Sequence, residues 1–262
     1  FAVCCATAAS FLACGATRGG LCVDVAGTAS VFAITVPHFR PDEERALSCG
    51  RAIAPGLWHA YAYVNGGGLN LEWFARELAG GGPQAAARLD RSADGLEWSE
   101  DDPFFVPHLG GRVAPAEPAL RGSWGGLTWT HTRPHLWRAQ LEGVAHEYAG
   151  YLKALRRLHP DLDVREVRVT GGGARSRTWN RLKADVLGLP VAPVARNEGA
   201  PLGAALLAAW GLGLVRDLHD AARTWIVLEP ACQPDPRRGE FFARRQRRYV
   251  ALLNHMIRWG RP

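Results

Sequence analysis

The sequence predicts an α/β fold with a mixed sheet flanked by helices. Segments rich in β-branched residues alternate with segments whose apolar residues recur every three or four positions. This alternation is typical of α/β folds whose sheet is at least partly parallel. Two of the turns between a strand-like and a helix-like segment, at residues 66–68 and 171–173, consist of three consecutive glycines. The 262 residues, 47% of them hydrophobic, suffice for a sizeable core in one large domain or two small ones.

A hairpin is predicted near the start of the chain. Residues 1–20 are apolar and Ala-rich, but they lack the basic region of a signal peptide and lead directly into strand-like sequence. "GLCVDVAGTASVFAITV", 20–36, predicts a strand, a tight turn at Gly27 and Thr28, and a second strand.

The next segment predicts a strand–turn–helix unit. "HAYAYVNGGGLNLEWFARELAG", 59–80, predicts a strand, a glycine turn and a helix that ends at Gly80 or Gly81. Pro, Gly, Asp and Ser crowd residues 80–118, which predicts a loop-rich surface segment.

The second half predicts four helices and two short strands. They are a long helix at 131–158, a strand at 164–170, a helix from the triple glycine through Val186, a strand at 190–195, a helix from about Pro201 to Trp210, and an amphipathic helix at 241–259.

Charge, tryptophan and cysteine usage exclude several classes of protein. The net charge is +6, but residues 237–262 alone hold eight Arg and one Glu. A solvated helix face is favoured there over a nucleic-acid surface, because no nucleic-acid motif accompanies the arginines and the ten Trp form no stacking pattern. No apolar run is long enough for a membrane span. The six Cys show no CxxC spacing, which favours a reduced, cytoplasmic compartment without metal or redox use.

Three glycine turns are candidates for phosphate binding: Gly27-Thr28, residues 66–68 and residues 171–173. The latter two precede predicted helices, and a helix N-terminus presents unpaired N–H groups that suit an anion. Any one such turn is more often structural. Neither GxxxxGK[ST] nor GxGxxG is present, so P-loop and Rossmann sites are not supported.

The other polar residues considered are interpreted as structural rather than catalytic or metal-binding. His131 and His135 have a spacing that a helical metal site uses, but no HExxH pattern joins them, so capping and packing are favoured. Glu142 is interpreted as a buried structural partner of an Arg rather than an acid catalyst. Asp101 and Asp102 are interpreted as solvated loop charges.

Several segments in order, from about Thr7 to Tyr249, resemble the FGGY family of carbohydrate kinases. They are "DVAGTAS" (24–30, phosphate-2 hairpin), "YAYVNGGGLNLEWF" (61–74, connecting segment), "GSWGGLTWTHTRPHLWRAQLEG" (122–143, second signature), "VTGGGARSRTWNRLKADVLGLPV" (169–191, adenosine motif, in the xylulokinase-like form) and "NEGAPLGAALLAAWGLG" (197–213, the following helix). Gln140 departs from the signature, which prefers a small or aliphatic residue there.

The resemblance implies a ribonuclease-H-like fold, as in actin and hexokinase. Residues 1–262 would be the C-terminal ATP-binding domain, with the N-terminal sugar-binding domain absent. The family transfers the γ-phosphoryl group of ATP to a sugar or polyol hydroxyl with Mg²⁺, and a ketopentose such as xylulose is the expected substrate. Faces that line a cleft or a dimer contact would be exposed, so we expect self-association, for example as a homodimer.

The resemblance also implies a nucleotide site. The residues carried over by motif are Gly27, Thr28, Gly68, Gly172, Gly173 and Ser176. Gly27 and Thr28 would face the ATP phosphates, and Gly68 would lie near the phosphates or ribose. Gly172 and Gly173 would pack against the nucleoside, with Ser176 near the base. No protein ligand for the metal is implied.

One departure concerns catalysis. The family usually places a general-base Asp just before "TAASFLACGA", and Ala6 occupies that position. Ala cannot accept a proton, and loss of a general base typically costs ~10²–10⁴-fold in rate. Asp24 is a poor substitute, because it precedes the hairpin on a different element. The alternative is therefore a non-catalytic nucleotide-binding or assembly module that has lost the base.

Overall fold

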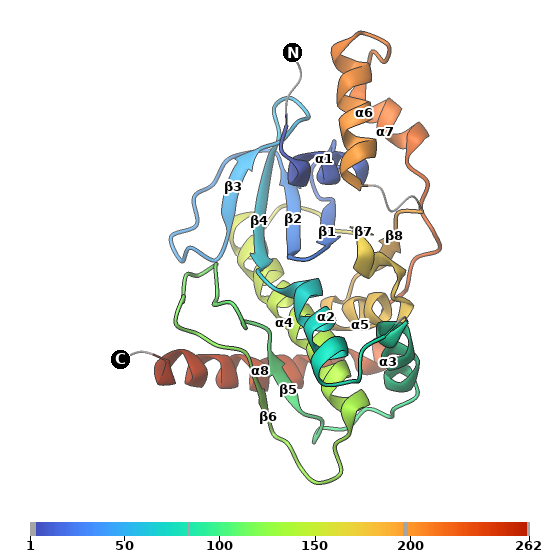
Figure 1. Cartoon of the computed structure of the whole chain (residues 1–262). Helices are drawn as coiled ribbons and strands as arrows, with labels where there is room; N and C mark the ends of the chain where they lie inside the picture. The colour runs from blue at the N-terminus through green and yellow to red at the C-terminus, as the bar shows by residue number, and fades with distance from the viewer. Residues whose placement is uncertain (1–3, 83, 196–198, 261–262) are drawn as a thin grey trace.

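A mixed β-sheet forms the centre of the protein (Figure 1). The computed structural model describes residues 4–82, 84–195 and 199–260. The sheet strands in this part of the chain are β1 (Cys22–Ala26), β2 (Ser30–Val36), β3 (Ser48–Arg51), β4 (Trp58–Val64), β7 (Val167–Thr170) and β8 (Val191–Pro193). Their order is β3-β4-β2-β1-β7-β8. The first four pair antiparallel, whereas β7 runs parallel to both β1 and β8. The predicted mixed sheet is confirmed.

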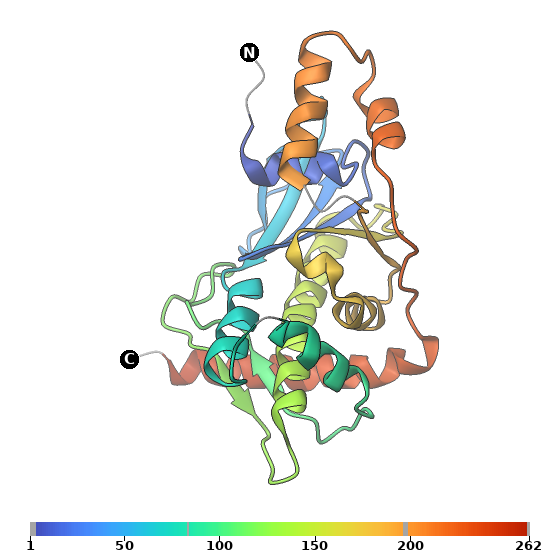
Figure 2. The ribbon, with the colours of Figure 1, turned by 45° about the vertical axis from the view of Figure 1, so that its right-hand side comes forward.

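Helices cover both faces of this sheet (Figures 1 and 2). The α-helices of the described residues are α1 (Ala6–Ala13), α2 (Gly67–Glu77), α3 (Ala85–Asp94), α4 (Arg133–Leu158), α5 (Arg177–Leu187), α6 (Gly199–Gly211), α7 (Leu218–Trp225) and α8 (Gly239–Trp259). Two 3₁₀ turns, η1 (Gly172–Arg175) and η2 (Pro236–Arg238), precede α5 and α8. None of these helices is long and apolar enough to cross a membrane.

The alternation of side chains along the strands decides which helix each residue meets. On β2, Phe32 points to the face covered by α4, where its ring stacks on that of Tyr148 at 4.8 Å. Its neighbour Ala33 points to the opposite face, where it packs in a cluster with Phe11 of α1. Successive residues of a strand point to opposite faces, so a sheet covered on both sides needs apolar residues at consecutive positions. The run "SVFAITV" of β2 meets that need.

The predicted hairpin is confirmed, and so are the strand before α2, the long helix α4, β7, β8 and the terminal helix. The helix α2 ends at Glu77, three residues before the predicted Gly80, and Leu78 caps it. The glycines that follow, at 80–82, have positive φ angles that other residues rarely adopt. The edge strand β3 was not predicted, because "SCGR" has no β-branched residue and forms a strand only by pairing with β4.

The segment 80–118 is more ordered than the sequence predicts. It contains α3 and the strand β5 (Phe104–Val106), which pairs with β6 (Ser123–Gly125). Asp101 is exposed as expected, but the prediction for Asp102 was wrong. Asp102 is buried, because its Oδ2 accepts a hydrogen bond from Arg138 Nη2 of α4 at 2.7 Å. The charge of that guanidinium offsets the cost of removing the carboxylate from water.

The C-terminal helix α8 crosses α4 (Figure 1) and forms a buried ion pair with it. Arg245 Nε donates to Glu142 Oε1 at 2.5 Å, and both side chains are almost fully buried. Burial alone would raise the pKa of Glu142. The hydrogen bond from His146 and the charge of Arg245 outweigh burial and lower that pKa to about 2. Tyr249 of the same helix donates to Glu147 at 2.7 Å. The predicted role of Glu142 is confirmed.

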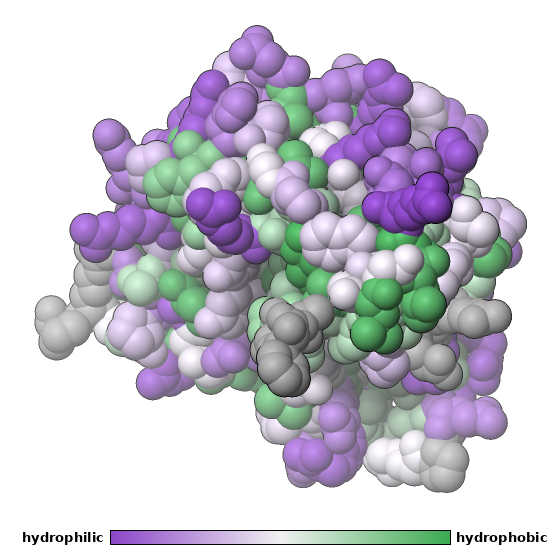
Figure 3. All heavy atoms as spheres, turned by 90° about the horizontal axis from the view of Figure 1, so that it is seen from above, coloured by the Kyte–Doolittle hydropathy of each residue, from purple (hydrophilic) through white to green (hydrophobic). Residues whose placement is uncertain are grey.

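The helices α1 and α6 pack tightly at the other end of the molecule. A Cβ on Gly203 would overlap the carbonyl of Ala9, so only glycine permits this approach. Beyond the contact, Leu212 and Leu214 are 76% and 75% exposed. Figure 3 looks down on this end and shows apolar side chains among polar ones. Self-association stays a prediction.

Candidate functional site

A cavity of about 1000 Å³ lies between the β1–β2 hairpin, the two glycine turns and α3. All six residues predicted for the nucleotide site line it. They are Gly27, Thr28, Gly68, Gly172, Gly173 and Ser176. These residues come from three segments far apart in the sequence, and the fold brings them to one place.

The first glycine turn docks α2 onto the hairpin. Gly68 N–H donates to the Gly27 carbonyl at 3.0 Å, and Leu69 N–H donates to the Thr28 carbonyl at 3.0 Å. A Cβ on Gly68 would overlap the Gly27 carbonyl. These two amide N–H groups of the first turn of α2 therefore donate hydrogen bonds within the protein and are not free to bind an anion. The exposed Thr28, at the hairpin tip, is left as the polar group facing the cavity.

The second glycine turn is built differently. Gly171 has a φ of +89°, and a Cβ there would lie 2.8 Å from the Ala26 carbonyl oxygen. A Cβ on Gly173 would lie 2.6 Å from the Trp179 ring. A Cβ on Gly172 would meet nothing within 4 Å. Only the middle glycine of the three therefore has open space at its Cβ position, and this residue also lines the cavity.

The helix after this turn begins later than predicted. The 3₁₀ turn η1 intervenes, and α5 starts at Arg177. The Ser176 Oγ accepts a hydrogen bond from Trp179 N–H at 3.0 Å and so caps the helix. Its hydroxyl hydrogen remains available on the cavity side as a donor.

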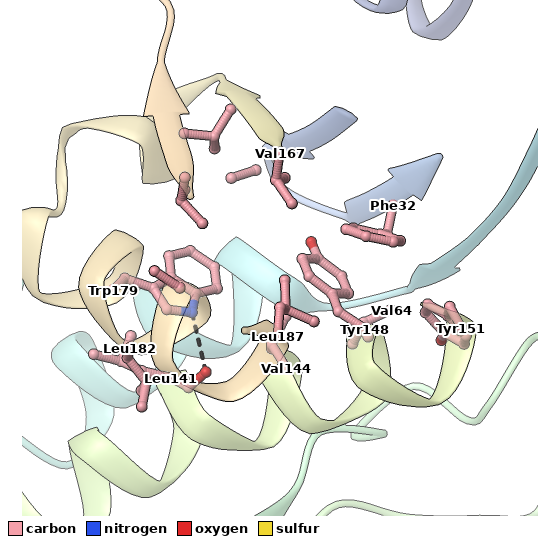
Figure 4. Close-up of a cluster of buried hydrophobic side chains, with 14 of the residues drawn as sticks. Phe32, Val64, Leu141, Val144, Tyr148, Tyr151, Val167, Trp179, Leu182 and Leu187 are labelled. Carbon is pink, nitrogen blue, oxygen red and sulfur yellow. Dashed lines mark hydrogen bonds between the residues drawn. The ribbon is translucent and has the colours of Figure 1, made fainter. Parts of the chain in front are cut away.

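Two indoles form apolar walls of the cavity. Trp179 Nε1 donates to the Leu141 carbonyl at 3.0 Å, as the dashed line in Figure 4 shows. Trp137 Nε1 donates to Asp90 Oδ1 at 2.8 Å. Both indole N–H groups are thus bonded within the protein, and both side chains are only 1% exposed, so the rings back the cavity from within the core. These residues were not predicted, although Trp137 and Leu141 lie four apart in the signature helix and so share one face.

Charged side chains of both signs line the same cavity. They are Glu72, Arg76, Asp90 and Arg175. Arg76 Nε is bonded to Glu77 at 2.6 Å. Arg175 is exposed, and within the described ranges it has no ion-pair partner. The sequence offered no signal for the residues of α3, because that helix was not predicted.

The remaining candidates lie outside the cavity. Ala6 is exposed at the start of α1 and is not among the lining residues. Asp24 is 0% exposed, and its carboxylate binds the Tyr148 hydroxyl at 2.7 Å and the Lys183 ammonium at 2.5 Å. A carboxylate so enclosed cannot reach a substrate hydroxyl.

His135 caps the start of α4, as predicted, whereas His131 closes the turn just before that helix. His135 Nδ1 accepts from Thr132 N–H at 3.1 Å, and His131 Nδ1 accepts from Thr128 N–H at 3.0 Å. Across the described residues, no three His, Cys, Asp or Glu side chains gather as a metal site. Asn197 and Glu198, which open the last matched motif, lie outside the described residues.

Comparison with known proteins shows the family to which the chain belongs. Residues 22–212 match the model of the FGGY family of carbohydrate kinases, C-terminal domain. The chain belongs to this family. The gluconokinase of Bacillus subtilis is 30% identical over 80% of this chain. The xylulose kinase of Staphylococcus epidermidis is 26% identical over 92% of it.

Solved structures of family members confirm the ribonuclease-H-like fold. The xylulose kinase from Rhodospirillum rubrum is 30% identical, with a TM-score of 0.87 over 97% of this chain and 51% of that one. The xylulose kinase from Brucella ovis is 26% identical, with a TM-score of 0.85 over 95% of this chain and 50% of that one. The chain also covers only 42% of the B. subtilis relative and 49% of the S. epidermidis one. It therefore spans about half the length of the relatives it matches.

Proposed function

We propose that this chain is the C-terminal, nucleotide-binding half of a kinase that transfers the γ-phosphoryl group of ATP to a sugar hydroxyl. The observation that carries the proposal is the gathering of six motif residues around one cavity. A volume of about 1000 Å³ lies at the upper end of the range usual for ligand pockets, which suits a nucleoside triphosphate. A ketopentose such as xylulose is the first candidate substrate, because xylulose kinases recur among the relatives. The sugar would be contacted through the half that only the relatives' chains include.

The six motif residues indicate how the nucleotide would lie. By the family resemblance, the phosphates would lie at the hairpin end with Gly27 and Thr28. The base would then lie beside the second glycine turn, where Gly172 has no side chain and lets a ligand approach the backbone. Phosphoryl transfer depends mostly on positioning and charge neutralisation, and rigid backbone turns provide the first of these.

Mg²⁺ would enter with the nucleotide. Mg²⁺ commonly keeps several waters and binds through substrate phosphates with one or two carboxylates. Such a metal needs no cluster of three protein ligands, so the described residues fit a metal carried by ATP. When bound, it would neutralise charge on the phosphates.

The alternative is a nucleotide-binding or assembly module without catalysis. Ala6 favours it, because the position that would hold the general base has no proton acceptor and Asp24 cannot replace it. The open space at Gly172 supports a nucleotide site in either case, since nothing in the protein itself requires a glycine there. The family match favours the kinase.

Calorimetric titration with ATP–Mg²⁺ tests the nucleotide site. We expect the chain to bind ATP and Gly172→Val to abolish binding without lowering the melting temperature. Gly150→Val is the matched control: that glycine is also exposed with nothing within 4 Å of a Cβ, but it lies on α4 outside the cavity. Binding that survives in Gly172→Val, or is lost equally in Gly150→Val, would place the nucleotide elsewhere.

A chimera separates the kinase from the assembly module. The chain would be joined to the N-terminal half of the R. rubrum xylulose kinase, and ATP-dependent phosphorylation of xylulose would be measured with and without Ala6→Asp. The kinase proposal expects the Asp variant to be faster by ~10²–10⁴-fold. Absence of turnover in both, with ATP binding intact, would favour the assembly module.

A further inference from the structure

A fully buried ion pair lies behind the wall of the cavity. Lys183 of α5 and Asp24 of β1 are each 0% exposed, with Nζ 2.5 Å from Oδ2. Tyr148 donates its hydroxyl hydrogen to the other carboxylate oxygen at 2.7 Å. Taking two charges out of water costs free energy that their attraction repays only in part, and an apolar pair of similar volume is often as stable. Stability alone therefore does not account for this pair.

The ammonium of this pair lies against the face of an indole. Lys183 Nζ is 3.7 Å from the centroid of the Trp179 ring. A cation at this distance is attracted by the ring quadrupole, most strongly where water is excluded. Burial lowers the pKa of Lys183, and the adjacent Asp24 carboxylate opposes that shift by favouring the ammonium form.

Trp179 is held by contacts of three kinds. Its face meets the Lys183 ammonium, its N–H donates to the Leu141 carbonyl, and its edge leaves no room for a Cβ on Gly173. Figure 4 shows the indole between the α4 and α5 side chains of the core. Trp179, Leu141 and Gly173 all line the cavity, whereas Lys183 does not.

The ion pair also joins the two sides of the cavity. Asp24 belongs to the strand that ends in the Gly27-Thr28 turn, and Lys183 belongs to the helix that follows the second glycine turn. We propose that Lys183 is a positioning residue, whose ammonium, held by Asp24, fixes the Trp179 indole and with it the Gly173 backbone on the indole's edge as a preformed wall for the nucleotide. This inference rests on the proposed function, because the wall acts on affinity only when a nucleotide occupies the cavity.

A neutral pair of substitutions tests the role without leaving a buried charge unpaired. The variant is Asp24→Asn/Lys183→Met, which keeps the approximate volume and removes both charges. We expect its melting temperature to stay near that of the unchanged chain. Its dissociation constant for ATP should rise about threefold to tenfold, because the indole is no longer fixed. Lys153→Met, at an exposed position of α4, is the matched control and should leave affinity unchanged.

Two further measurements distinguish positioning from general destabilisation. Trp179→Phe is combined with the neutral pair in a double-mutant cycle of ATP affinity. If Lys183 acts through the indole, the two effects fall short of additivity, whereas independent structural effects add. The fluorescence of Trp179 is obtained by subtracting the spectrum of the Trp179→Phe counterpart from that of each protein. Its emission maximum should shift when the Lys183 ammonium is removed.

The outcomes separate this inference from the function on which it rests. Equal ATP affinity and equal Trp179 emission in the neutral-pair variant would overturn the role of Lys183 while leaving the nucleotide site standing. Failure of the unchanged chain to bind ATP would count against the proposed function instead. The emission spectrum of the free protein would then still decide whether Lys183 sets the indole, since that measurement needs no nucleotide.

Discussion

The two triple-glycine turns share a composition but differ in what requires it. In the turn before α2, a Cβ on Gly68 would overlap the Gly27 carbonyl, and two amides of the helix's first turn are bonded to the hairpin. In the turn before α5, the middle residue Gly172 has open space where a side chain would be. A run of glycines is therefore a poor guide to a ligand site by itself. The informative glycine is the one where the packing of the protein would also allow a side chain.

The largest effect should come from breaking the first turn. Gly68→Ala pushes a Cβ into backbone, which cannot rotate away, and we expect a loss of about 3 kcal/mol in unfolding free energy. Urea denaturation monitored by circular dichroism measures this. A loss below about 0.5 kcal/mol would show that α2 can shift away from the hairpin, and the contrast between the turns would disappear.

Acid should weaken the strand that leads into the first turn. Burial lowers the pKa of His59 on β4 from 6.5 to about 4. The unfolded chain therefore binds a proton that the folded chain does not accept. The stabilisation is present above pH 6.5 and is lost as the pH falls toward 4, by roughly 3 kcal/mol in total.

Denaturation curves of the unchanged chain and His59→Gln across this pH range isolate that contribution. The variant should lose less stability on acidification than the unchanged chain. Parallel pH profiles for the two proteins would mean that His59 is not the group responsible.

Gly173→Ala should have an intermediate effect within the second turn. The new Cβ would approach the Trp179 ring and Ala26 Cβ, at 2.6 Å and 2.7 Å. Because these neighbours are side chains that can give slightly, we expect a loss of about 2 kcal/mol in unfolding free energy and a displaced indole. Thermal unfolding and tryptophan emission report the two changes. An unchanged emission spectrum would argue that the indole is not in contact with the turn.

Gly172→Ala should have the smallest effect on stability and a clear one on the ligand. We expect the unfolding free energy to change by less than about 0.5 kcal/mol. ATP affinity should fall about tenfold, as for one overcrowded contact of about 1.4 kcal/mol. Parallel calorimetry and denaturation test both halves of the expectation. A destabilised variant with intact affinity would reverse the assignment of the two glycine positions.

Local patterns predicted the parts of the fold that local sequence determines. The hairpin around Gly27, the helix α4 and the junction at Gly172 follow from residue types and periodicity over short windows. The family resemblance also named six of the residues that line the cavity, although no pattern shows which glycine has open space beside it. That depends on backbone brought from elsewhere in the chain.

What the sequence could not predict depends on distant partners. The strand β3 exists because β4 offers an edge, and Asp102 is buried because Arg138 reaches it from α4. The pairing of Asp24 with Lys183 spans 159 positions and has no local signature. Burial of a charge is decided by its partner, so a loop carboxylate looks solvated until the fold is known.

The buried polar contacts between α4 and α8 bear on how the chain matures. Glu142 is made early, and Arg245, its buried partner, follows 103 residues later. During synthesis this carboxylate therefore stays without its guanidinium partner until α8 has been made. The family match ends at residue 212, yet α8 begins at Gly239 and supplies both Arg245 and Tyr249. A chain cut before α8 would lose both of these partners and leave the carboxylates of Glu142 and Glu147 uncovered, so we expect α8 to be needed for α4 to pack as it does here.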